Sequence, residues 1–161
     1  MNIRNANIND LSAVSAIYAK AREFMSANGN AEQWGGGYPS DELIKSDIER
    51  EKLFLCMDGE MIAGVFYFSL ENDPTYEKIY DGRWLNDRKY AVIHRVAVAV
   101  QGKGVVSFCF EYCFKICQNI KIDTHKNNIP MQRALEKNGF RLCGKIYLEN
   151  GEERLAYQRS E

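Results

Sequence analysis

The sequence lacks the features that mark several common classes of protein. Its 21 lysine and arginine residues nearly balance 22 aspartate and glutamate residues, and the net charge is −1. Nucleic-acid binding relies on clustered positive charge, so this balance argues against a nucleic-acid partner. The longest run without a charged residue, Met61 to Leu70, is far too short to cross a bilayer. No apolar signal core follows Met1, and we therefore expect a cytoplasmic protein with no membrane partner.

The five cysteines show no pattern that predicts a disulfide framework or a metal site. Their number is odd, whereas disulfide frameworks use paired cysteines in secreted chains. Cys109, Cys113 and Cys117 are spaced four apart, which places them on one side of a helix. Structural zinc sites instead use short paired spacings, and no second pair is present. We expect these cysteines to be small core residues, with no bound metal.

Length and composition predict one globular domain over residues 1–161. Hydrophobic residues make up 45% and charged residues 27% of the chain, which is typical of a soluble fold. Strand-like and helix-like periodicities alternate in the middle of the chain, and hairpins flank them. This order predicts a mixed sheet with helices on both faces. Strands are expected over 2–6, 53–57, 61–70, 90–100, 120–124, 140–148 and 152–158, and helices are expected to begin near residues 10, 41, 105 and 129.

A glycine-rich turn between the strand over 90–100 and the following helix is the strongest chemical signal. Residues 101–106 read Gln-Gly-Lys-Gly-Val-Val. Such a turn points free backbone N–H groups at one spot, where the helix dipole also favours an anion such as a phosphate. A plain helix start is the other interpretation. Gly104 follows Lys103 where a P-loop needs Ser or Thr, and Ser107 stands where a Rossmann motif needs its third glycine.

The same segment resembles the signature of the GNAT family of N-acetyltransferases. Gln101 and Gly104, after the strand residues Val96-Ala97-Val98, match its Arg/Gln-x-x-Gly loop. Asn128, followed eleven residues later by Gly139-Phe140, is similar to its downstream motif. The order of the elements also agrees, so the resemblance covers essentially the whole chain. It implies an α+β fold with a splayed, mostly antiparallel mixed sheet that opens between the fourth and fifth strands.

The resemblance also implies acetyl-CoA as the co-substrate, bound in that gap. Its pantetheine would pair with the backbone at Val96 and Val98, and Asn128 would lie beside the pantetheine or phosphate arm. Its pyrophosphate would rest on the amides of one turn, made of Gln101, Gly102, Lys103, Gly104, Val105, Val106 and Ser107. The sequence departs from the family pattern in three ways. Val106 replaces a small residue, the link from Val98 to the turn is short, and Leu135 replaces a tyrosine that is a general acid in many members.

The candidate catalytic residues are His94 and Tyr147. An alkylamine with a pKa of about 10.4 arrives protonated at neutral pH, so a base must remove its proton before it attacks a thioester. His94 lies on the fourth strand, four residues before Val98, and the ordinary histidine pKa of about 6.5 suits a base. A histidine satisfied within the sheet is the alternative. Tyr147 is the candidate acid that replaces the missing tyrosine, although strand tyrosines commonly serve packing.

The expected acceptor pocket is bordered by loop residues. In the family, the corresponding loops flank the acceptor, which implies roles for Gln33, Trp34, Tyr38 and Trp84; covering the core is the alternative. His125 follows the fifth strand and is expected to line the site. Asp123 lies two residues earlier on the same face, so the two suit an orienting pair. No nucleophilic Ser or Cys is marked nearby, so a hydrolase triad is not supported.

These features predict an N-acetyltransferase that transfers an acetyl group from acetyl-CoA to a primary amine by direct attack in a ternary complex. The expected partner is a small-molecule or peptide amine, and a homodimer is left open. Two alternatives remain. One is an N-acyltransferase that uses another acyl-CoA. The other is a non-catalytic CoA-binding or sensing module, or a phosphate-anchored interaction domain.

Overall fold

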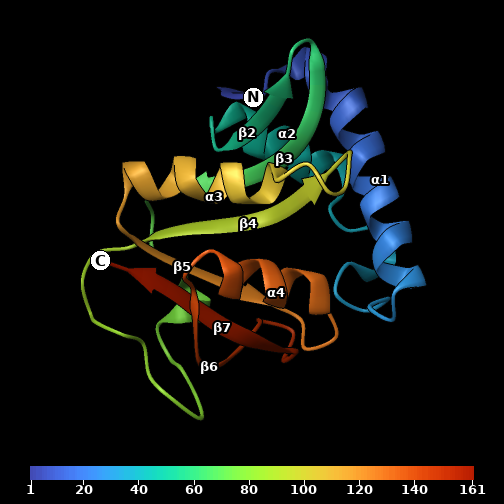
Figure 1. Ribbon diagram of the computed structural model, residues 1–161. Coiled ribbons are helices and arrows are strands. Elements are labelled where there is room, and N and C mark those ends of the chain that lie inside the picture. The colour runs from blue at the N-terminus through green and yellow to red at the C-terminus, as the bar shows by residue number, and fades with distance from the viewer.

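The computed structural model describes residues 1–161 and contains one seven-stranded sheet, in the order β1-β2-β3-β4-β5-β7-β6 (Figure 1). Three short 3-10 helices lie in the loops: η1 (Ile8–Asp10), η2 (Gly35–Gly37) and η3 (Pro74–Tyr76). The α-helices are α1 (Leu11–Ala27), α2 (Asp41–Glu49), α3 (Val105–Ile116) and α4 (Ile129–Lys137). The strands are β1 (Asn2–Asn5), β2 (Leu53–Asp58), β3 (Met61–Ser69), β4 (Ala91–Val98), β5 (Asn119–Thr124), β6 (Arg141–Tyr147) and β7 (Glu153–Ser160).

The sheet opens between β4 and β5, as expected. All neighbouring strands pair antiparallel except these two, which are parallel. Their pairing is limited to Ala91 with Ile120 and Val92 with Lys121. Beyond these residues the two strands diverge, as Figure 1 shows. The gap therefore leaves backbone groups of β4 and β5 without the ladder partners that a continuous sheet would supply.

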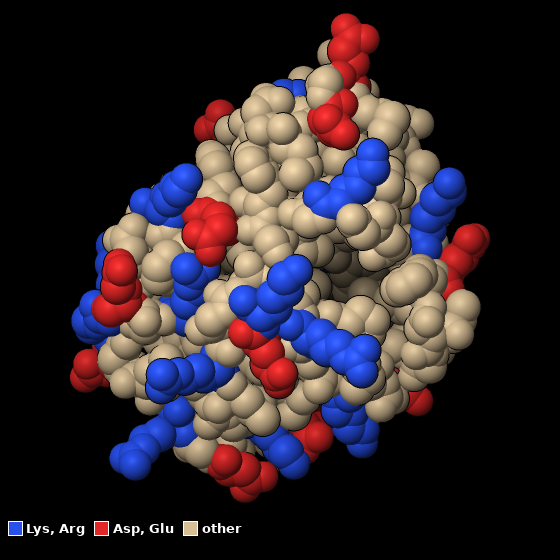
Figure 2. Space-filling model, in the orientation of Figure 1, with Lys and Arg blue, Asp and Glu red and all other residues tan.

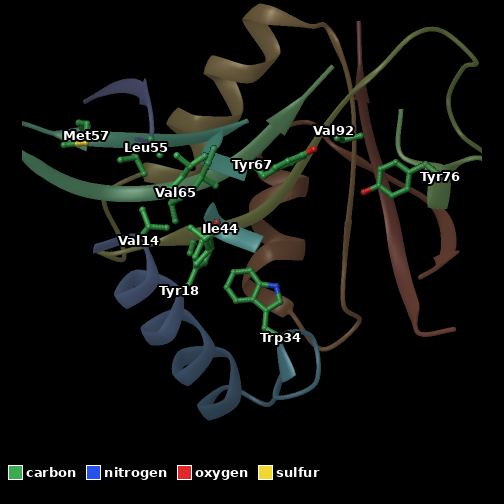
Figure 3. Close-up of a cluster of buried hydrophobic side chains, with 14 of the residues drawn as sticks. Val14, Tyr18, Trp34, Ile44, Leu55, Met57, Val65, Tyr67, Tyr76 and Val92 are labelled. Carbon is green, nitrogen blue, oxygen red and sulfur yellow. The ribbon is translucent and has the colours of Figure 1, made fainter. Parts of the chain in front are cut away.

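Helices cover both faces of the sheet because the strands alternate their buried side chains. On β3, Val65 and Tyr67 join the core under α1 and α2, whereas Phe66 and Phe68 join the core under α3 and α4. In Figure 1, α3 and α4 lie in front of the sheet. Figure 3 shows the first core, where Tyr18 of α1 and Ile44 of α2 meet the strand side chains. The predicted mixed α+β fold with helices on both faces is confirmed.

The cysteines of α3 are core residues, as predicted. Cys109 and Cys113 are buried against the sheet, and all five cysteines are free thiols. Burial raises the pKa of both thiols, so they stay protonated at neutral pH. No three His, Cys, Asp or Glu side chains come together as a metal-binding group. None of the helices combines the length and the apolar character that crossing a membrane requires.

A bulge in β4 shapes the inner wall of the gap. Val65 pairs with Ala97 and Tyr67 pairs with His94, so two residues of β4 stand opposite one residue of β3. One of them, Arg95, has a left-handed backbone with φ of 52°. Its Nε donates to the Asp47 carboxylate of α2 at 2.9 Å, and its carbonyl accepts from the Tyr18 hydroxyl at 2.7 Å. Tyr18 of α1 and Asp47 of α2 therefore fix the backbone and the side chain of Arg95 in the bulge.

Candidate active site

The gap between β4 and β5 is a cavity of about 710 Å³. Its walls come from β4 up to Val96, from β5 at residues 122–124, and from the loops that precede α2, β4 and β7. Figure 2 shows a hollow between the positions of α3 and α4, with Lys and Arg side chains along one side of it. The cavity is therefore reached through the sheet, where the strand ladder is interrupted.

The turn that leads into α3 has the features of an anion site. Gly104 is the N-cap residue with φ of 70°, and no side chain caps the helix. The first N–H groups of α3 therefore have no partner within the helix. Residues 101–104 are exposed, and nothing lies within 4 Å of a Cβ built on Gly102 or Gly104. Val98 and this turn lie beyond Val96, the last residue of β4 that lines the cavity. Val106 packs against the core under α3 and α4 instead of filling the turn.

A buried hydroxyl in the gap has no partner in the protein. Thr124, at the end of β5, is fully buried and lines the cavity. Its Oγ1 makes no hydrogen bond. Buried polar atoms are nearly always hydrogen-bonded, and the exceptions call for an explanation such as a ligand or a water. The orphaned hydroxyl and the uncapped turn are both features that an acyl-CoA bound in the gap would satisfy, so the residues present fit that group.

His94 stands at the inner end of the gap between two carboxylates. Its Nε2 lies 2.9 Å from Asp73 Oδ2, and its Nδ1 lies 3.8 Å from Asp123 Oδ1. Burial of Asp73 favours its neutral form, but hydrogen bonds from His94 and Thr75 outweigh that effect and lower the pKa of Asp73 to about 2. Asp73 is therefore an ionised acceptor at neutral pH, so His94 Nε2 carries the hydrogen of this bond. The Nδ1 lone pair of the neutral imidazole is then free.

Asp123 is held by a buried tyrosine. The hydroxyl of Tyr76 donates to Asp123 Oδ1. Tyr76 is almost completely buried, and this burial, together with Asp123, raises the pKa of Tyr76 well above its ordinary value. The Tyr76 ring also lies beside the His94 ring, with centroids 5.9 Å apart. Asp73 and Tyr76 belong to η3 and its N-cap, so this short helix positions groups on both sides of the imidazole.

Solved structures show what this arrangement is similar to. The structure superposes on an acetyltransferase of the GNAT family from Streptococcus agalactiae 2603, with a TM-score of 0.92 and 29% sequence identity over 99% of this chain and 95% of that one. The chain has the fold of the GNAT-family acetyltransferases. A GNAT-family acetyltransferase from Listeria monocytogenes 4b F2365 gives a TM-score of 0.72 and 18% identity, over 99% of this chain and 94% of that one.

A further fold neighbour carries a ligand. It is a GNAT-like decarboxylase in complex with isobutyryl-CoA, with a TM-score of 0.68 and 16% identity over 99% of both chains. By contrast, the sequence matches no protein-family model and no curated protein. The GNAT assignment therefore rests on three-dimensional similarity together with the turn and Asn128 motifs.

Within this GNAT fold, six of the predicted site residues line the cavity: His94, Val96, Asn128, Gln33, Trp34 and Tyr38. Asn128 caps α4, since its Oδ1 accepts from the Met131 N–H at 3.2 Å. Its Nδ2 donates to Gln33 Oε1 at 2.9 Å, which ties α4 to the loop before α2. That loop also brings Trp34 and Tyr38 to the cavity wall. Trp34 is buried, and its ring contacts the ring of Tyr18 edge-on (Figure 3).

His125 is near the cavity, but its predicted pairing with Asp123 is wrong. Asp123 bonds to Tyr76 and faces His94, so it does not orient His125. Instead, Nδ1 of His125 accepts from the N–H of Asn127 at 3.0 Å, and Nε2 lies 3.9 Å from Glu32. Burial and the positive charge of Arg154 lower the pKa of His125, which favours its neutral form. His125 is a buried turn residue with its Nε2–H directed toward the Glu32 carboxylate.

Two predicted residues lie away from the cavity. Tyr147 is 42% exposed, and its ring packs edge-on against Tyr80, so it does not reach the site as an acid. Trp84 packs behind Tyr76, and its Nε1 donates to the Tyr76 carbonyl at 2.9 Å. Leu135, at the position of the tyrosine acid of many GNAT members, is fully buried in the core.

Sequence reasoning missed four residues of the site: Asp73, Tyr76, Arg95 and Thr124. The Asp-Pro-Thr sequence at 73–75 signals a capped turn, and Asp73 does accept from the N–H of Thr75 at 2.9 Å. That signal does not say which strand the turn will face. Nothing in the alternating apolar pattern of β4 marks the bulge at Arg95. Thr124 resembles any β-branched residue of a strand.

Proposed function

We propose that the protein is an acyl-CoA-dependent N-acyltransferase that transfers an acetyl group to a primary amine in a ternary complex. One observation carries this proposal: the gap places a candidate base on one face of the sheet and an orphaned hydroxyl on the other. His94 lies two residues after Val92 on β4 and so points to the same face, where Val92 packs in the core under α1 and α2. Thr124 follows Asp123 on β5 and therefore points to the opposite face. A donor and an acceptor can meet in the gap from opposite faces.

The donor side of the proposal uses the backbone of β4 and the turn into α3. Amides of residues 101–107 would hold the pyrophosphate, and the β4 backbone near Val96 would hold the pantetheine. The Thr124 hydroxyl would complete its hydrogen bonding to the same molecule. When bound, the acyl-CoA supplies a carbonyl that is activated as a thioester. In this chain Asn128 is engaged with Met131 and Gln33, so its proposed role is to shape the wall.

The acceptor side of the proposal uses His94. A proton of the ammonium passes to His94 Nδ1, and the freed nitrogen lone pair forms the bond to the acyl carbon. The carbon–sulfur bond then breaks, and the CoA thiolate leaves with the second proton of the nitrogen. Asp73 holds the Nε2–H throughout, and its negative charge stabilises the imidazolium that results. Asp73 therefore acts through His94, as a positioning residue.

The experiment is thiol release from acetyl-CoA with mixtures of primary amines, with isobutyryl-CoA as a parallel donor. Replacing His94 with Ala should lower kcat by about 10²–10⁴, the usual contribution of a general base. Acetyl-CoA affinity, measured by calorimetry, should stay unchanged, because the base acts on the transition state. Tyr147→Phe is the matched control, since this exposed side chain lies away from the cavity.

Two outcomes would contradict the proposal. If the wild-type protein binds acetyl-CoA but releases no thiol with any amine, a CoA-binding module is the better description. If His94→Ala stays within a factor of about two of wild type, His94 is not the base. A rising limb of the pH–rate profile whose midpoint moves with the pKa of the amine would likewise show that His94 is not the base.

A further inference from the structure

We infer that the acceptor amine binds as a cation between His94 and Asp123, and that Asp123 is the residue that selects it. This inference rests on the proposed function. It names the class of acceptor, a primary alkylammonium ion, and assigns a specificity role to Asp123.

The first step is the geometry of the two facing atoms. His94 Nδ1 and Asp123 Oδ1 are 3.8 Å apart, which is too far for a direct hydrogen bond. When His94 is neutral, both are acceptors, because Asp73 takes the hydrogen on Nε2 and a carboxylate has none to give. The donor that Asp123 does have, the Tyr76 hydroxyl, approaches from within the protein. A primary ammonium carries three N–H donors and can bond to both atoms at once.

The second step is the charge of this end of the cavity. Asp73 and Asp123 keep only 20% and 12% of their side chains exposed, and neither forms an ion pair with a Lys or Arg. The three arginines of the cavity wall are already held by other carboxylates: Arg50 by Glu71, Arg95 by Asp47, and Arg154 by Glu152. One imidazole therefore faces two carboxylates. Partly buried charges call for a partner, and a cation supplies it.

The third step is independent evidence that a ligand occupies this gap. The residue after Asp123 is Thr124, whose buried hydroxyl lines the same cavity without a hydrogen-bond partner. The polar groups on the two faces of β5 differ in kind. On the His94 face the carboxylate of Asp123 has no Lys or Arg partner, and on the opposite face the hydroxyl of Thr124 has no hydrogen-bond partner. The acceptor cation and the uncharged pantetheine therefore each have a matching face.

The consequence for catalysis is that recognition and deprotonation use the same nitrogen. An ammonium held by Asp123 has a second N–H directed at His94 Nδ1. Transfer of that proton leaves the lone pair that attacks the acyl carbon, and Asp123 keeps its contact through a remaining N–H. The CoA thiolate leaves as the carbon–sulfur bond breaks and takes the second proton that the nitrogen must lose. Alcohols carry no charge for Asp123 to recognise. Quaternary ammonium ions carry no N–H, so neither class should be an acceptor.

The test measures ammonium binding without any acyl donor. Methylammonium chloride is titrated against protein whose histidine side chains carry ¹⁵N, and the His94 signals are followed. The chain has only two histidines, so His125→Gln assigns them. Sodium chloride and methanol serve as the salt and neutral controls. Asp123→Asn removes the charge and keeps an oxygen for Tyr76. Asp58→Asn, at an exposed hairpin position, is the matched variant.

The expected result is a saturating shift of the His94 signals with methylammonium alone, weakened about 10- to 100-fold in Asp123→Asn and unchanged in Asp58→Asn, as for the loss of a hydrogen bond to a charged group. The KM for methylamine in the thiol-release assay should rise by the same factor. A response equal to that of sodium chloride, or equal affinity in Asp123→Asn, would overturn the inference. If methylammonium binds as expected but no thiol is released, the cation site stands and the proposed function fails. If thiol is released with an unchanged KM in Asp123→Asn, the proposed function stands and the cation site fails.

Discussion

Replacing Asp73 with Asn should lower the stability of the protein in a way that depends on pH. The folded protein lowers the pKa of Asp73 from 3.8 to about 2, despite its burial, through bonds from His94 and Thr75. A difference of one pH unit corresponds to about 1.4 kcal/mol, so the ionised carboxylate contributes about 2 kcal/mol at neutral pH. Because the folded-state pKa is the lower one, this stability is present above pH 4–5 and is lost as the pH falls toward 2.

The assay is urea unfolding of the wild type and Asp73→Asn at a series of pH values from 7 down to 3. The difference in unfolding free energy should be about 2 kcal/mol at pH 7 and roughly half as large at pH 3. In a His94→Gln background the same substitution should cost less, since the largest stabilising bond is already gone. A difference that stays constant from pH 7 to pH 3 would refute the reasoning, because the loss would then come from shape and not from charge.

Three further predictions concern the turn, the bulge and the metal content. Gly104→Glu should abolish acetyl-CoA binding in calorimetry without unfolding the domain, because it puts a carboxylate and a strained φ at the anion site; equal binding by the variant would remove the turn from the site. Asp47→Asn should cost about 3–5 kcal/mol in urea unfolding, because it leaves the buried Arg95 charge uncompensated; a loss below about 1 kcal/mol would show that water or Tyr38 compensates it. Chelator treatment should leave thiol release unchanged, and about one equivalent of tightly held zinc in elemental analysis would contradict this.

The fold could be predicted because its signals are local. Helix caps at Ser40 and Asn128, with side chains that accept from Leu43 and Met131, match the predicted helix starts. The apolar run over 61–70 predicts a strand, and the structure shows β3 there, buried on both faces. These patterns depend on a few neighbouring residues, so no knowledge of the tertiary arrangement was needed.

The parts of the site that could not be predicted depend on the order of the strands. β7 lies between β5 and β6, so β6 is an edge strand, and Tyr147 at its end is remote from the gap. The sequence favours Tyr147 as the replacement acid and does not mark Tyr76, whose hydroxyl donates to Asp123 of β5. Asp123 accepts from Tyr76, 47 positions earlier in the chain, a contact that no local spacing reveals.

The segment between β3 and β4 has a consequence for how the molecule opens. The two halves of the sheet share only two ladder pairs, and their other contacts run through the cores on the two faces. The segment between β3 and β4 adds hydrogen bonds to the second half of the sheet. Leu85 N–H donates to Gln158, Asn119 donates to Asn86, and Tyr76 donates to Asp123. Amide hydrogen exchange of β5 and β7 should therefore follow the integrity of this loop rather than that of the β4–β5 ladder. After a proteolytic cut within residues 77–83, the β5–β7 amides should lose protection before those of β1–β4.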